Sequence, residues 1–241
     1  MTTPQQESHL LRAGFKVADT TTPKRVILSI EGLERTGKTH LAMTSEGDIS
    51  YIYTDFGHEA VLHKFEKKGR RIYKVDIESG ATLVQMGDIE AASKAWNKLR
   101  TAYYTALDNS STVIVDTATE MWELLRMARF GKLTQVMPHQ YGPVNAEYRE
   151  LIRRAYDNPK VSLILLHKMK QEYVGNNRTG RMERSGFSET GFMVQMQIRC
   201  SREEGEFMAE VLDCRHNPSL QGLVLTGPMS NIPTILDLVH G

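Results

Sequence analysis

Cysteine, an excess of charge and long apolar runs are scarce or missing in this sequence. Its 241 residues include 2 cysteines, and 30 Lys plus Arg against 29 Asp plus Glu leave a formal net charge of +1. The balanced charge excludes a bulk polycation. Cys200 and Cys214 are too few for a disulfide framework and have no His or Cys at metal-ligand spacing nearby, so we expect two reduced core thiols.

Membrane and export signals are also missing from the sequence. No apolar run approaches the roughly 18 residues that a membrane span requires. The first residues, MTTPQQESHLLRAGF, contain neither a basic n-region nor an apolar h-region. We therefore expect a cytoplasmic protein with no membrane partner.

The composition is that of an ordinary globular chain, with 40% hydrophobic and 24% charged residues. Residues 1–22 are polar, rich in Thr and Gln, and lack apolar periodicity. We predict a flexible N-terminal arm over residues 1–22 and one domain over residues 23–241.

Short apolar runs without polar alternation predict buried strands at residues 26–30, 49–55, 71–75, 112–116 and 161–166. Strands that are apolar on both faces belong in a mainly parallel sheet covered by helices on both faces. Apolar stripes with helical spacing predict these helices at residues 89–106, 121–128 and 148–155.

The pattern changes after residue 166. A polar, Gly-bearing stretch, residues 169–191, leads into two runs, 193–200 and 207–214, that predict an antiparallel hairpin with Gly205 in its turn. A short strand at 223–225 and a helix at 232–239 follow. The predicted fold class is α/β, with a C-terminal antiparallel hairpin.

A phosphate-binding loop, the Walker A motif, follows the first apolar run. The residues fit G-x-x-x-x-G-K-[ST], between a strand and a helix-compatible segment. The glycines let the backbone curl so that its N–H groups face phosphate oxygens. Lys38 is expected to reach the β- and γ-phosphates of ATP, and Thr39 to ligate Mg²⁺. The predicted nucleotide-binding residues are Gly32, Leu33, Glu34, Arg35, Thr36, Gly37, Lys38, Thr39 and His40.

Hydrolysis requires further carboxylates. One should hold the metal from the end of an apolar strand beside the P-loop strand, and Asp116, which ends the run TVIVD, supplies it. Another should polarise the attacking water, for which the candidates are Asp55 and Glu59. Asp55 is preferred, although an Asp at a strand end also commonly caps the next helix.

His167 and Lys168 follow the run at 161–166, at the edge of the sheet where ligands bind in open α/β folds. A polar residue there can sense the γ-phosphate. The alternative for His167 is a satisfied, partly buried histidine.

This order of motifs resembles a RecA-type ATPase core, and specifically the small phage-encoded RecA-like ATPases related to single-strand annealing and recombination proteins. The resemblance covers residues 24–225 and rests on the Walker A motif, IYTDFG, VIVDT, LILLHK, a glycine-bearing loop and a hairpin. It implies that His167 links the γ-phosphate to a DNA-binding loop. RecA-like enzymes generally carry Glu where this chain has Asp55. A phage source would place the protein in the host cytoplasm.

The resemblance assigns DNA binding to residues 169–191. Residues 168–184 contain five basic side chains against two acidic ones, a net charge of +3, and Tyr173 or Phe187 is available for base stacking. The alternative is a solvated mobile loop. The predicted contacts to single-stranded DNA are Lys168, Lys170, Arg178, Arg181 and Arg184.

RecA-like ATPases assemble head to tail, as rings or filaments, and a basic residue of one subunit reaches the nucleotide of the next. Arg215, at the end of the second hairpin strand, is similar in position, while Arg199 and Arg202 are weaker candidates. The segment Phe15-Lys16-Val17-Ala18 resembles the F-x-x-A polymerisation tag of eukaryotic recombinases. A single-strand-binding protein is a further candidate partner.

The leading hypothesis is therefore an ATP- and Mg²⁺-dependent ATPase that binds single-stranded DNA in recombination, annealing or repair. A small-molecule P-loop kinase is the first alternative, with residues 168–184 as its basic lid. A nucleotide-gated module without turnover, such as a loader for a helicase or single-strand-binding protein, is the second. Stimulation of ATP hydrolysis by DNA rather than by a metabolite distinguishes these hypotheses.

Overall fold

The computed structural model describes residues 9, 11–16, 24–55, 59–65, 69–131, 136–175 and 177–240. Its main sheet has eight strands in the order β10-β9-β8-β1-β5-β4-β2-β3, and a separate two-stranded sheet pairs β6 with β7. The strands are β1 (Ile27–Gly32), β2 (Ile49–Tyr53), β3 (Ile72–Asp76), β4 (Thr112–Asp116), β5 (Ser162–His167), β6 (Met169–Val174), β7 (Asn177–Arg184), β8 (Met196–Glu203), β9 (Glu206–Cys214) and β10 (Val224–Thr226).

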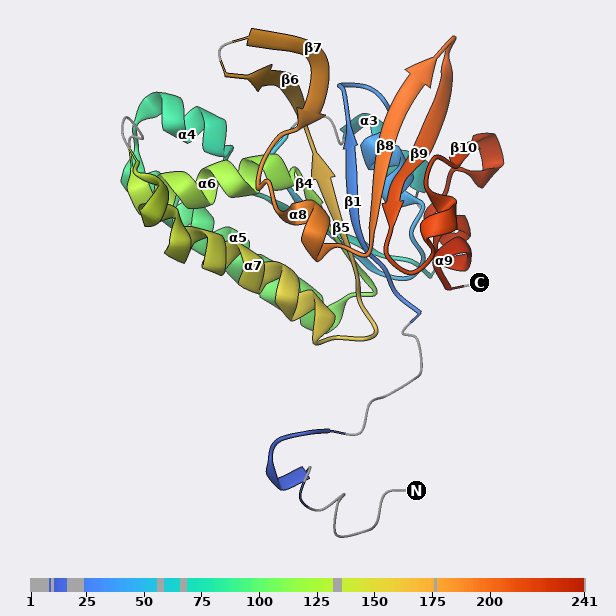
Figure 1. The fold of residues 1–241 in the computed structure, drawn as a ribbon, viewed down its shortest axis with the longest axis horizontal. Helices are drawn as coiled ribbons and strands as arrows, with labels where there is room; N and C mark the ends of the chain where they lie inside the picture. Colours follow the sequence, from blue (N-terminus) through green and yellow to red (C-terminus); the bar gives the residue numbers. More distant parts are fainter. Residues whose placement is uncertain are drawn as a thin grey trace.

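Helices cover both faces of the main sheet (Figure 1). One face carries α4 (Gly80–Met86), α5 (Ile89–Asn109), α6 (Ala118–Phe130) and α7 (Tyr141–Tyr156), and the other carries α2 (Lys38–Met43), α3 (Glu59–Leu62) and α9 (Ile232–His240). The short helix α8 (Thr190–Met193) precedes β8. The 3₁₀ turns are His63–Phe65, Pro138–Gln140, Pro218–Leu220 and Gly227–Met229.

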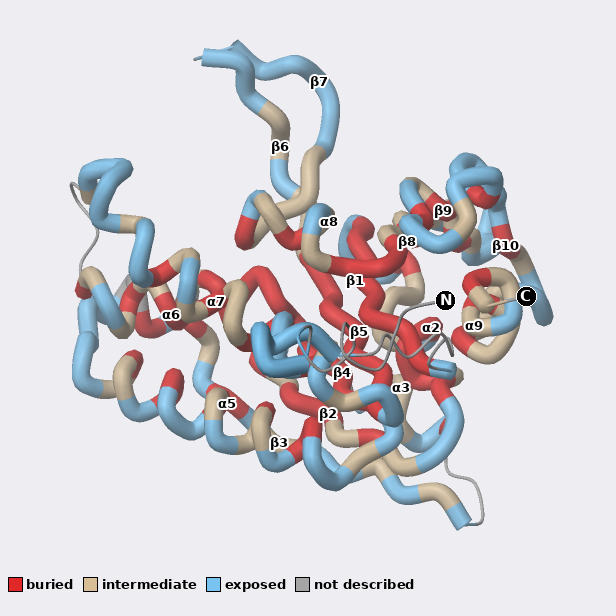
Figure 2. Tube along the Cα trace, turned by 60° about the horizontal axis from the view of Figure 1, so that its bottom comes forward, coloured by how far each residue is buried: buried red, intermediate tan, exposed pale blue. Residues whose placement is uncertain are grey.

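Alternation along the central strands divides the core into two clusters. In β1, Ile27 packs with residues of α5, α6 and α7, while Leu28 and Ile30 pack with residues of α2 and α9. All six residues of β1 and of β5 are buried, and the tube in Figure 2 shows this buried centre. Burial of apolar side chains on both faces is what the continuous apolar runs predict.

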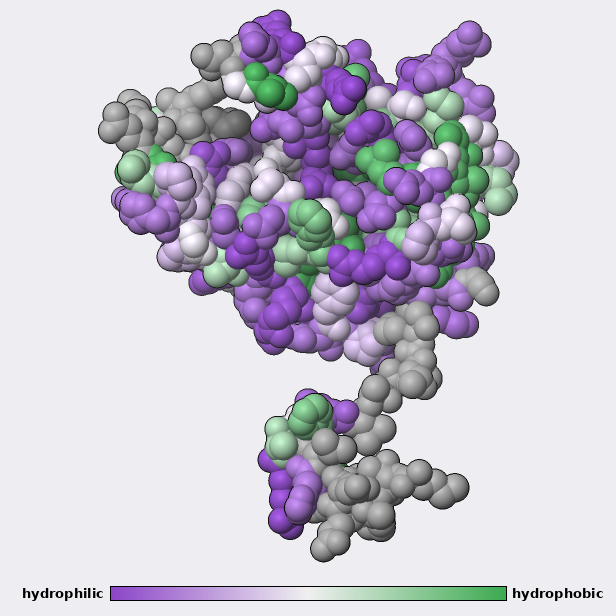
Figure 3. Space-filling view, in the orientation of Figure 1, coloured by the Kyte–Doolittle hydropathy of each residue, from purple (hydrophilic) through white to green (hydrophobic). Residues whose placement is uncertain are grey.

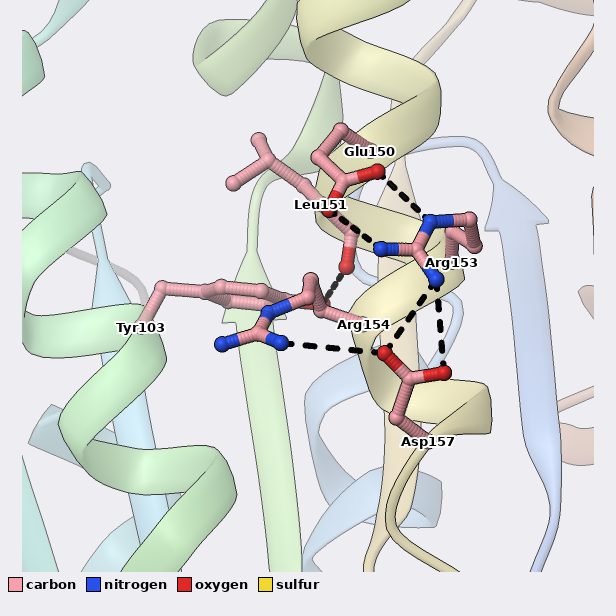
Figure 4. Close-up of polar contacts among 6 residues, drawn as sticks. All are labelled: Tyr103, Glu150, Leu151, Arg153, Arg154 and Asp157. Atoms are coloured by element: carbon pink, nitrogen blue, oxygen red, sulfur yellow. Dashed lines mark hydrogen bonds and ion pairs between the residues drawn. The ribbon is translucent and has the colours of Figure 1, made fainter.

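The α5–α7 contact combines a buried core with an exposed ionic surface (Figure 4). Tyr103 of α5 is buried, and its hydroxyl donates to the Leu151 carbonyl oxygen of α7 at 2.7 Å. On the solvent side of α7, Arg153 pairs with Glu150 at 2.6 Å and with Asp157 at 3.3 Å. These exposed ion pairs contribute little to stability, whereas burial of the apolar stripe stabilises the packing of α7 against the sheet.

The predicted fold class is confirmed. Strands β8, β1, β5, β4, β2 and β3 run parallel, and β9 and β10 add antiparallel pairs. The predicted hairpin forms from β8 and β9, and Gly205 lies in its turn with φ +91°. Cys200 and Cys214 are free and buried, as expected.

Three expectations about the fold are wrong. The strand β4 does not lie beside β1, because β5 is inserted between them. The strand β3 is largely exposed, because it forms an edge of the sheet. The polar stretch after β5 is not a loop: β6 and β7 form an antiparallel ribbon that stands out from the main sheet, above β5 in Figure 1.

The predicted arm over residues 1–22 lies largely outside the described residues. Of the F-x-x-A segment, Phe15 and Lys16 are described and exposed, whereas Val17 and Ala18 lie outside the description. Within the described chain, no helix is both long and apolar enough to cross a membrane.

Candidate nucleotide site

The P-loop connects β1 to α2 at the carboxyl edge of the sheet. Gly37 has φ +88°, a conformation that favours glycine, and it precedes Lys38, the first residue of α2. A Cβ on Gly32 would lie 2.6 Å from the Cys200 carbonyl oxygen of β8. Both motif glycines are therefore required by the local backbone.

A cleft of about 1180 Å³ opens over this loop. All nine predicted nucleotide-binding residues, from Gly32 to His40, line it, together with Asp55, Asp116 and Lys168. The tip of the β8–β9 hairpin closes another side, where the Phe207 ring lies 3.0 Å from the position of a Cβ on Gly37. The cleft thus combines a backbone cradle with side chains of both charges, among them Lys38, Lys168, Asp55 and Asp116.

Lys38 lies folded against its own loop. Its ammonium donates to the carbonyl oxygens of Gly32 at 2.8 Å and Leu33 at 2.6 Å. Burial lowers the pKa of Lys38, and the Asp116 carboxylate opposes this shift. Anionic phosphate oxygens are stronger acceptors for this ammonium than the two neutral carbonyls.

Asp116 meets Thr39 across the cleft. Thr39 Oγ1 donates to Asp116 Oδ2 at 2.8 Å, and the hydroxyl of Tyr51 donates to the same oxygen at 2.8 Å. Burial raises the pKa of Asp116, while these two hydrogen bonds act in the opposite direction. A hydroxyl and a carboxylate oxygen side by side form an all-oxygen donor set that fits Mg²⁺.

The structure distinguishes the two candidates for activating water, Asp55 and Glu59. Asp55 follows β2, lines the cleft and interacts electrostatically with Lys38. Glu59 begins α3 and is exposed, and it is not among the residues that line the cleft. The geometry therefore favours Asp55 for this role.

His167 does not face the cleft. It is fully buried, on the same face of β5 as Leu165, which packs with α6 and α7. Its Nδ1 lies 3.3 Å from the Ser185 carbonyl oxygen, and its Nε2 has no hydrogen-bond partner among the described residues. Burial lowers the pKa of His167 to about 3. The position of His167 thus agrees with the alternative hypothesis of a buried histidine. It differs in that Nε2 has no hydrogen-bond partner among the described residues.

Three arginines are candidates for contacting the nucleotide of a neighbouring subunit, and they lie at different positions along the β8–β9 hairpin. Arg199 pairs with the buried Glu31 at 2.6 Å. Arg202 lies near the tip, with its guanidinium 5.0 Å from the Phe207 ring centroid. Arg215 follows β9 at the opposite edge of the sheet, where its guanidinium donates to the Phe192 carbonyl oxygen. Arg215 therefore cannot serve the nucleotide of its own chain.

Some of the predicted DNA-binding side chains are exposed, and others are engaged in an ion pair or a hydrogen bond within the protein. Arg178 and Arg181 are exposed on the β6–β7 ribbon, and Arg178 stacks on the exposed ring of Tyr173. Lys170 lies on the same ribbon, 3.3 Å from Glu183. Arg184 is half-buried at the base, where it donates to Gln197 Oε1 at 2.8 Å.

Phe187 and Lys168 are placed differently from the exposed residues of the ribbon. Phe187 is buried between Trp122 and Tyr148, at ring distances of 5.0 and 4.9 Å, so it is not available to stack on a base. Lys168 lines the nucleotide cleft and pairs with Glu120 at 2.7 Å, so it does not belong to the exposed face of the ribbon.

Tyr51, Glu120 and Phe207 contribute to the site and were not predicted from the sequence. Tyr53 is the register partner of Asp116, and Tyr51, two residues earlier, lies on the same face of β2 as Tyr53. Knowledge of the strand pairing would therefore have indicated that Tyr51 is near Asp116. The sequence contains no comparable signal for Glu120 or Phe207, because their neighbours at the cleft are distant along the chain.

Comparison with known proteins gives a family and likenesses to solved structures. No curated protein matches the chain. A solved structure titled "Crystal structure of the RadB recombinase" is 13% identical, over 85% of this chain and 87% of that chain, with a TM-score of 0.48. This likeness carries no conclusion about function. The AAA domain family matches residues 24–203, which include the P-loop and Asp116. The chain belongs to the AAA domain family, and its cleft is the P-loop site of a nucleotide hydrolase.

Proposed function

We propose that this protein is a Mg²⁺-dependent ATPase that binds single-stranded DNA and acts in DNA recombination, annealing or repair. The observation that carries the proposal is the junction of two features at one edge of the sheet. The strand β5 ends at His167 and the ribbon begins at Met169, so Lys168 alone separates them. A nucleotide cleft and an arginine-bearing ribbon that share a junction can respond to each other.

The nucleotide chemistry follows from the residues of the cleft. Lys38 would leave the two carbonyl oxygens for the phosphates, and the backbone N–H groups of the P-loop would hold the remaining oxygens. Thr39 and Asp116 would hold Mg²⁺, which supplies charge neutralisation between the β- and γ-phosphates. Asp55, at the rim of the cleft, would orient the attacking water and accept its proton.

The ribbon would supply the DNA contact. Arg178 and Arg181 are exposed on β7, and the exposed Tyr173 ring on β6 lies beside Arg178. Arginines neutralise backbone phosphates, and an aromatic face stacks on bases without regard to sequence. Single strands, which present unpaired bases, fit this combination better than duplexes.

The position of Arg215 supports a head-to-tail homo-oligomer, as a ring or a filament. A basic residue at the sheet edge opposite the cleft can reach a nucleotide only in a neighbouring copy. In that arrangement, ATP would lie at subunit interfaces and Arg215 would stabilise the charge of the transition state.

The experiment compares ATP hydrolysis by the wild type, Lys38→Ala and Lys94→Ala, with and without single-stranded DNA, at low and moderate salt. Lys94 is exposed on α5 and serves as the matched surface control. We expect DNA to stimulate the wild type and Lys94→Ala, with less stimulation at higher salt, and Lys38→Ala to be inactive.

Other outcomes would replace the proposal. Phosphate transfer to a metabolite without any effect of DNA would indicate a small-molecule kinase. ATP binding without turnover, even with DNA, would indicate a nucleotide-gated loader, and binding of a single-strand-binding protein would then be tested.

A further inference from the structure

The Phe207 ring forms an exposed aromatic surface on the wall of the nucleotide cleft. Phe207 is the second residue of β9, next to the tip of the β8–β9 hairpin, and is 47% exposed. Among the described residues that line the cleft, it is the only phenylalanine, tyrosine or tryptophan. An exposed ring on the wall of a ligand cleft offers a flat apolar surface to a planar group of the ligand.

Two neighbours hold this ring in place. Arg202 of β8 is the register partner of Phe207, and its guanidinium lies over the ring, 5.0 Å from the centroid. Arg202 Nε also donates to the Gly205 carbonyl oxygen in the hairpin turn at 3.4 Å. On the P-loop side, the ring atom Cδ1 lies 3.0 Å from the position of a Cβ on Gly37. Since Arg202 covers one face and Gly37 meets the edge, the opposite face is the one left for a ligand.

The hairpin and the candidate metal ligand lie on opposite sides of the P-loop strand. In the main sheet, β8, β9 and β10 lie on one side of β1, and β5, β4 and β2 lie on the other. Asp116 ends β4 and Asp55 follows β2, so the carboxylates of the site belong to the second side, whereas Phe207 belongs to the first. The P-loop at the end of β1 holds the phosphates between them. A nucleotide whose terminal phosphate points toward Asp116 therefore extends its sugar and base toward Phe207.

The hairpin side of the cleft has room for a base. Gly227 and Ser230 line it, and they follow β10, whose Thr226 is the register partner of Met208 beside Phe207. The whole cleft measures about 1180 Å³. Sites for complete small molecules measure roughly 300–1,000 Å³, so this cleft is larger than a phosphate chain alone requires.

We propose that Phe207 is the stacking platform for the base of the bound nucleotide and that it makes the cleft prefer purines to pyrimidines. This inference rests on the proposed nucleotide function and deepens it. Stacking on an aromatic ring increases with the area of overlap, so a two-ring purine gains more than a one-ring pyrimidine. The P-loop holds the phosphates whatever the base, so the contribution of Phe207 can be measured separately.

Inorganic tripolyphosphate separates the two contributions, because it contains the phosphate chain without a base. Calorimetric titration measures its affinity and that of the β,γ-imido analogue of ATP, with Mg²⁺ and without DNA. Phe207→Ala should weaken binding of the analogue by about tenfold, which corresponds to one stacked base, and leave the affinity for tripolyphosphate unchanged. The matched control is Phe192→Ala, which removes an 81% exposed ring of α8 that does not line the cleft, and it should change neither affinity.

Phe207→Trp keeps an aromatic platform and adds a direct signal. The native Trp96 and Trp122 are buried, so the introduced indole reports on the cleft. This variant should bind the ATP analogue at least as tightly as the wild type, and its fluorescence should change with the analogue and not with tripolyphosphate. In the wild type, ADP should bind more tightly than UDP, and Phe207→Ala should reduce this difference.

Equal losses of affinity for the ATP analogue and for tripolyphosphate in Phe207→Ala would show that Phe207 supports the P-loop through Gly37, and would overturn the proposal. An unchanged affinity for the analogue in this variant, or equal binding of ADP and UDP by the wild type, would also overturn it. Each of these results leaves the ATPase proposal standing, because the wild type still binds nucleotide. Absence of binding of both the analogue and tripolyphosphate by the wild type would overturn both proposals.

Discussion

The Asp116 carboxylate is buried and accepts hydrogen bonds from two neighbouring hydroxyls. Burial raises its pKa, and the hydrogen bonds from Tyr51 and Thr39 lower it again. Thr39 is also a candidate metal ligand, whereas Tyr51 acts only through Asp116. Tyr51 is therefore a positioning residue whose removal should change the pH dependence of the site more than its architecture.

Tyr51→Phe should shift the acidic limb of Mg²⁺-dependent nucleotide binding to higher pH, because Asp116 loses a donor to its charged form. The expected shift is about 1 pH unit, the equivalent of one hydrogen bond to a carboxylate. The measurement is the affinity for an ATP analogue between pH 5 and 8, with and without Mg²⁺. Tyr53→Phe, on the same strand and stacked on Tyr51, is the control and should not move the limb. If the acidic limb of the pH profile is the same for Tyr51→Phe and Tyr53→Phe, Tyr51 does not influence the ionisation of Asp116.

His167 makes stability dependent on pH. Its folded pKa is about 3, below the value of about 6.5 in an unfolded chain. The unfolded state therefore binds a proton that the folded state does not, so the contribution of the neutral ring is complete above pH 6.5 and is lost as the pH falls toward 3. The loss amounts to about 1.4 kcal/mol per pH unit within this window.

His167→Gln should flatten this dependence, because Gln does not titrate. Urea unfolding of the wild type and the variant at pH 7.5, 6 and 5 measures the difference between their free energies of unfolding. The wild type should lose more stability than the variant over this range. Parallel curves would show that His167 has the same pKa in the folded and the unfolded chain, and would contradict this reasoning.

Among the elements, α5 and α7 show how differently buried and exposed polar contacts contribute. Tyr103→Phe removes a buried hydroxyl that donates to Leu151, and should cost about 1 kcal/mol of unfolding free energy. That loss corresponds to a fall of roughly 2–4 °C in melting temperature. Arg153→Ala removes two exposed ion pairs (Figure 4) and should change the melting temperature little. Calorimetry at low and high salt compares them, and a larger loss for Arg153→Ala would contradict this reasoning.

The sequence predicts the central strands and the main helices because each buries a continuous apolar run or stripe. It does not predict the ribbon, since β7 is polar and mostly exposed and therefore has no apolar alternation to detect. The insertion of β5 between β1 and β4 also escapes prediction, because strand order depends on tertiary packing rather than on local pattern. Within the site, the motif identifies Lys38 and Thr39, whereas the Lys168–Glu120 pair depends on the register of distant elements.

The ribbon should carry the salt dependence of DNA binding. The combined changes Arg178→Gln and Arg181→Gln should weaken binding to single-stranded oligonucleotides and reduce the slope of log affinity against log salt by about 1.4. Fluorescence anisotropy over a salt series measures the slope. The matched control, Arg153→Gln with Arg154→Gln, removes the same charge from the far end of α7. Equal slopes in both double variants would exclude the ribbon as the DNA contact.

At the scale of the whole molecule, the β9–β10 end of the main sheet exposes apolar side chains. Phe207, Val224 and Met229 are exposed around β9 and β10, where Figure 3 shows hydrophobic surface among polar residues. The nucleotide cleft opens at the carboxyl edge of the sheet, and Arg215 lies at the opposite edge. A head-to-tail assembly would bring cleft and Arg215 of successive copies together.

Mixing two inactive variants tests this assembly. In Lys38→Ala the cleft fails but Arg215 is intact, and in Arg215→Ala the reverse holds. If Arg215 acts in trans, equal amounts of the two should restore ATP hydrolysis with DNA to about a quarter of the wild-type rate, because one interface in four joins an intact Lys38 to an intact Arg215. The restored rate should fall on dilution, since it requires contact between copies. A mixture that hydrolyses no faster than the separate variants, or an Arg215→Ala variant with normal activity alone, would exclude the trans role of Arg215.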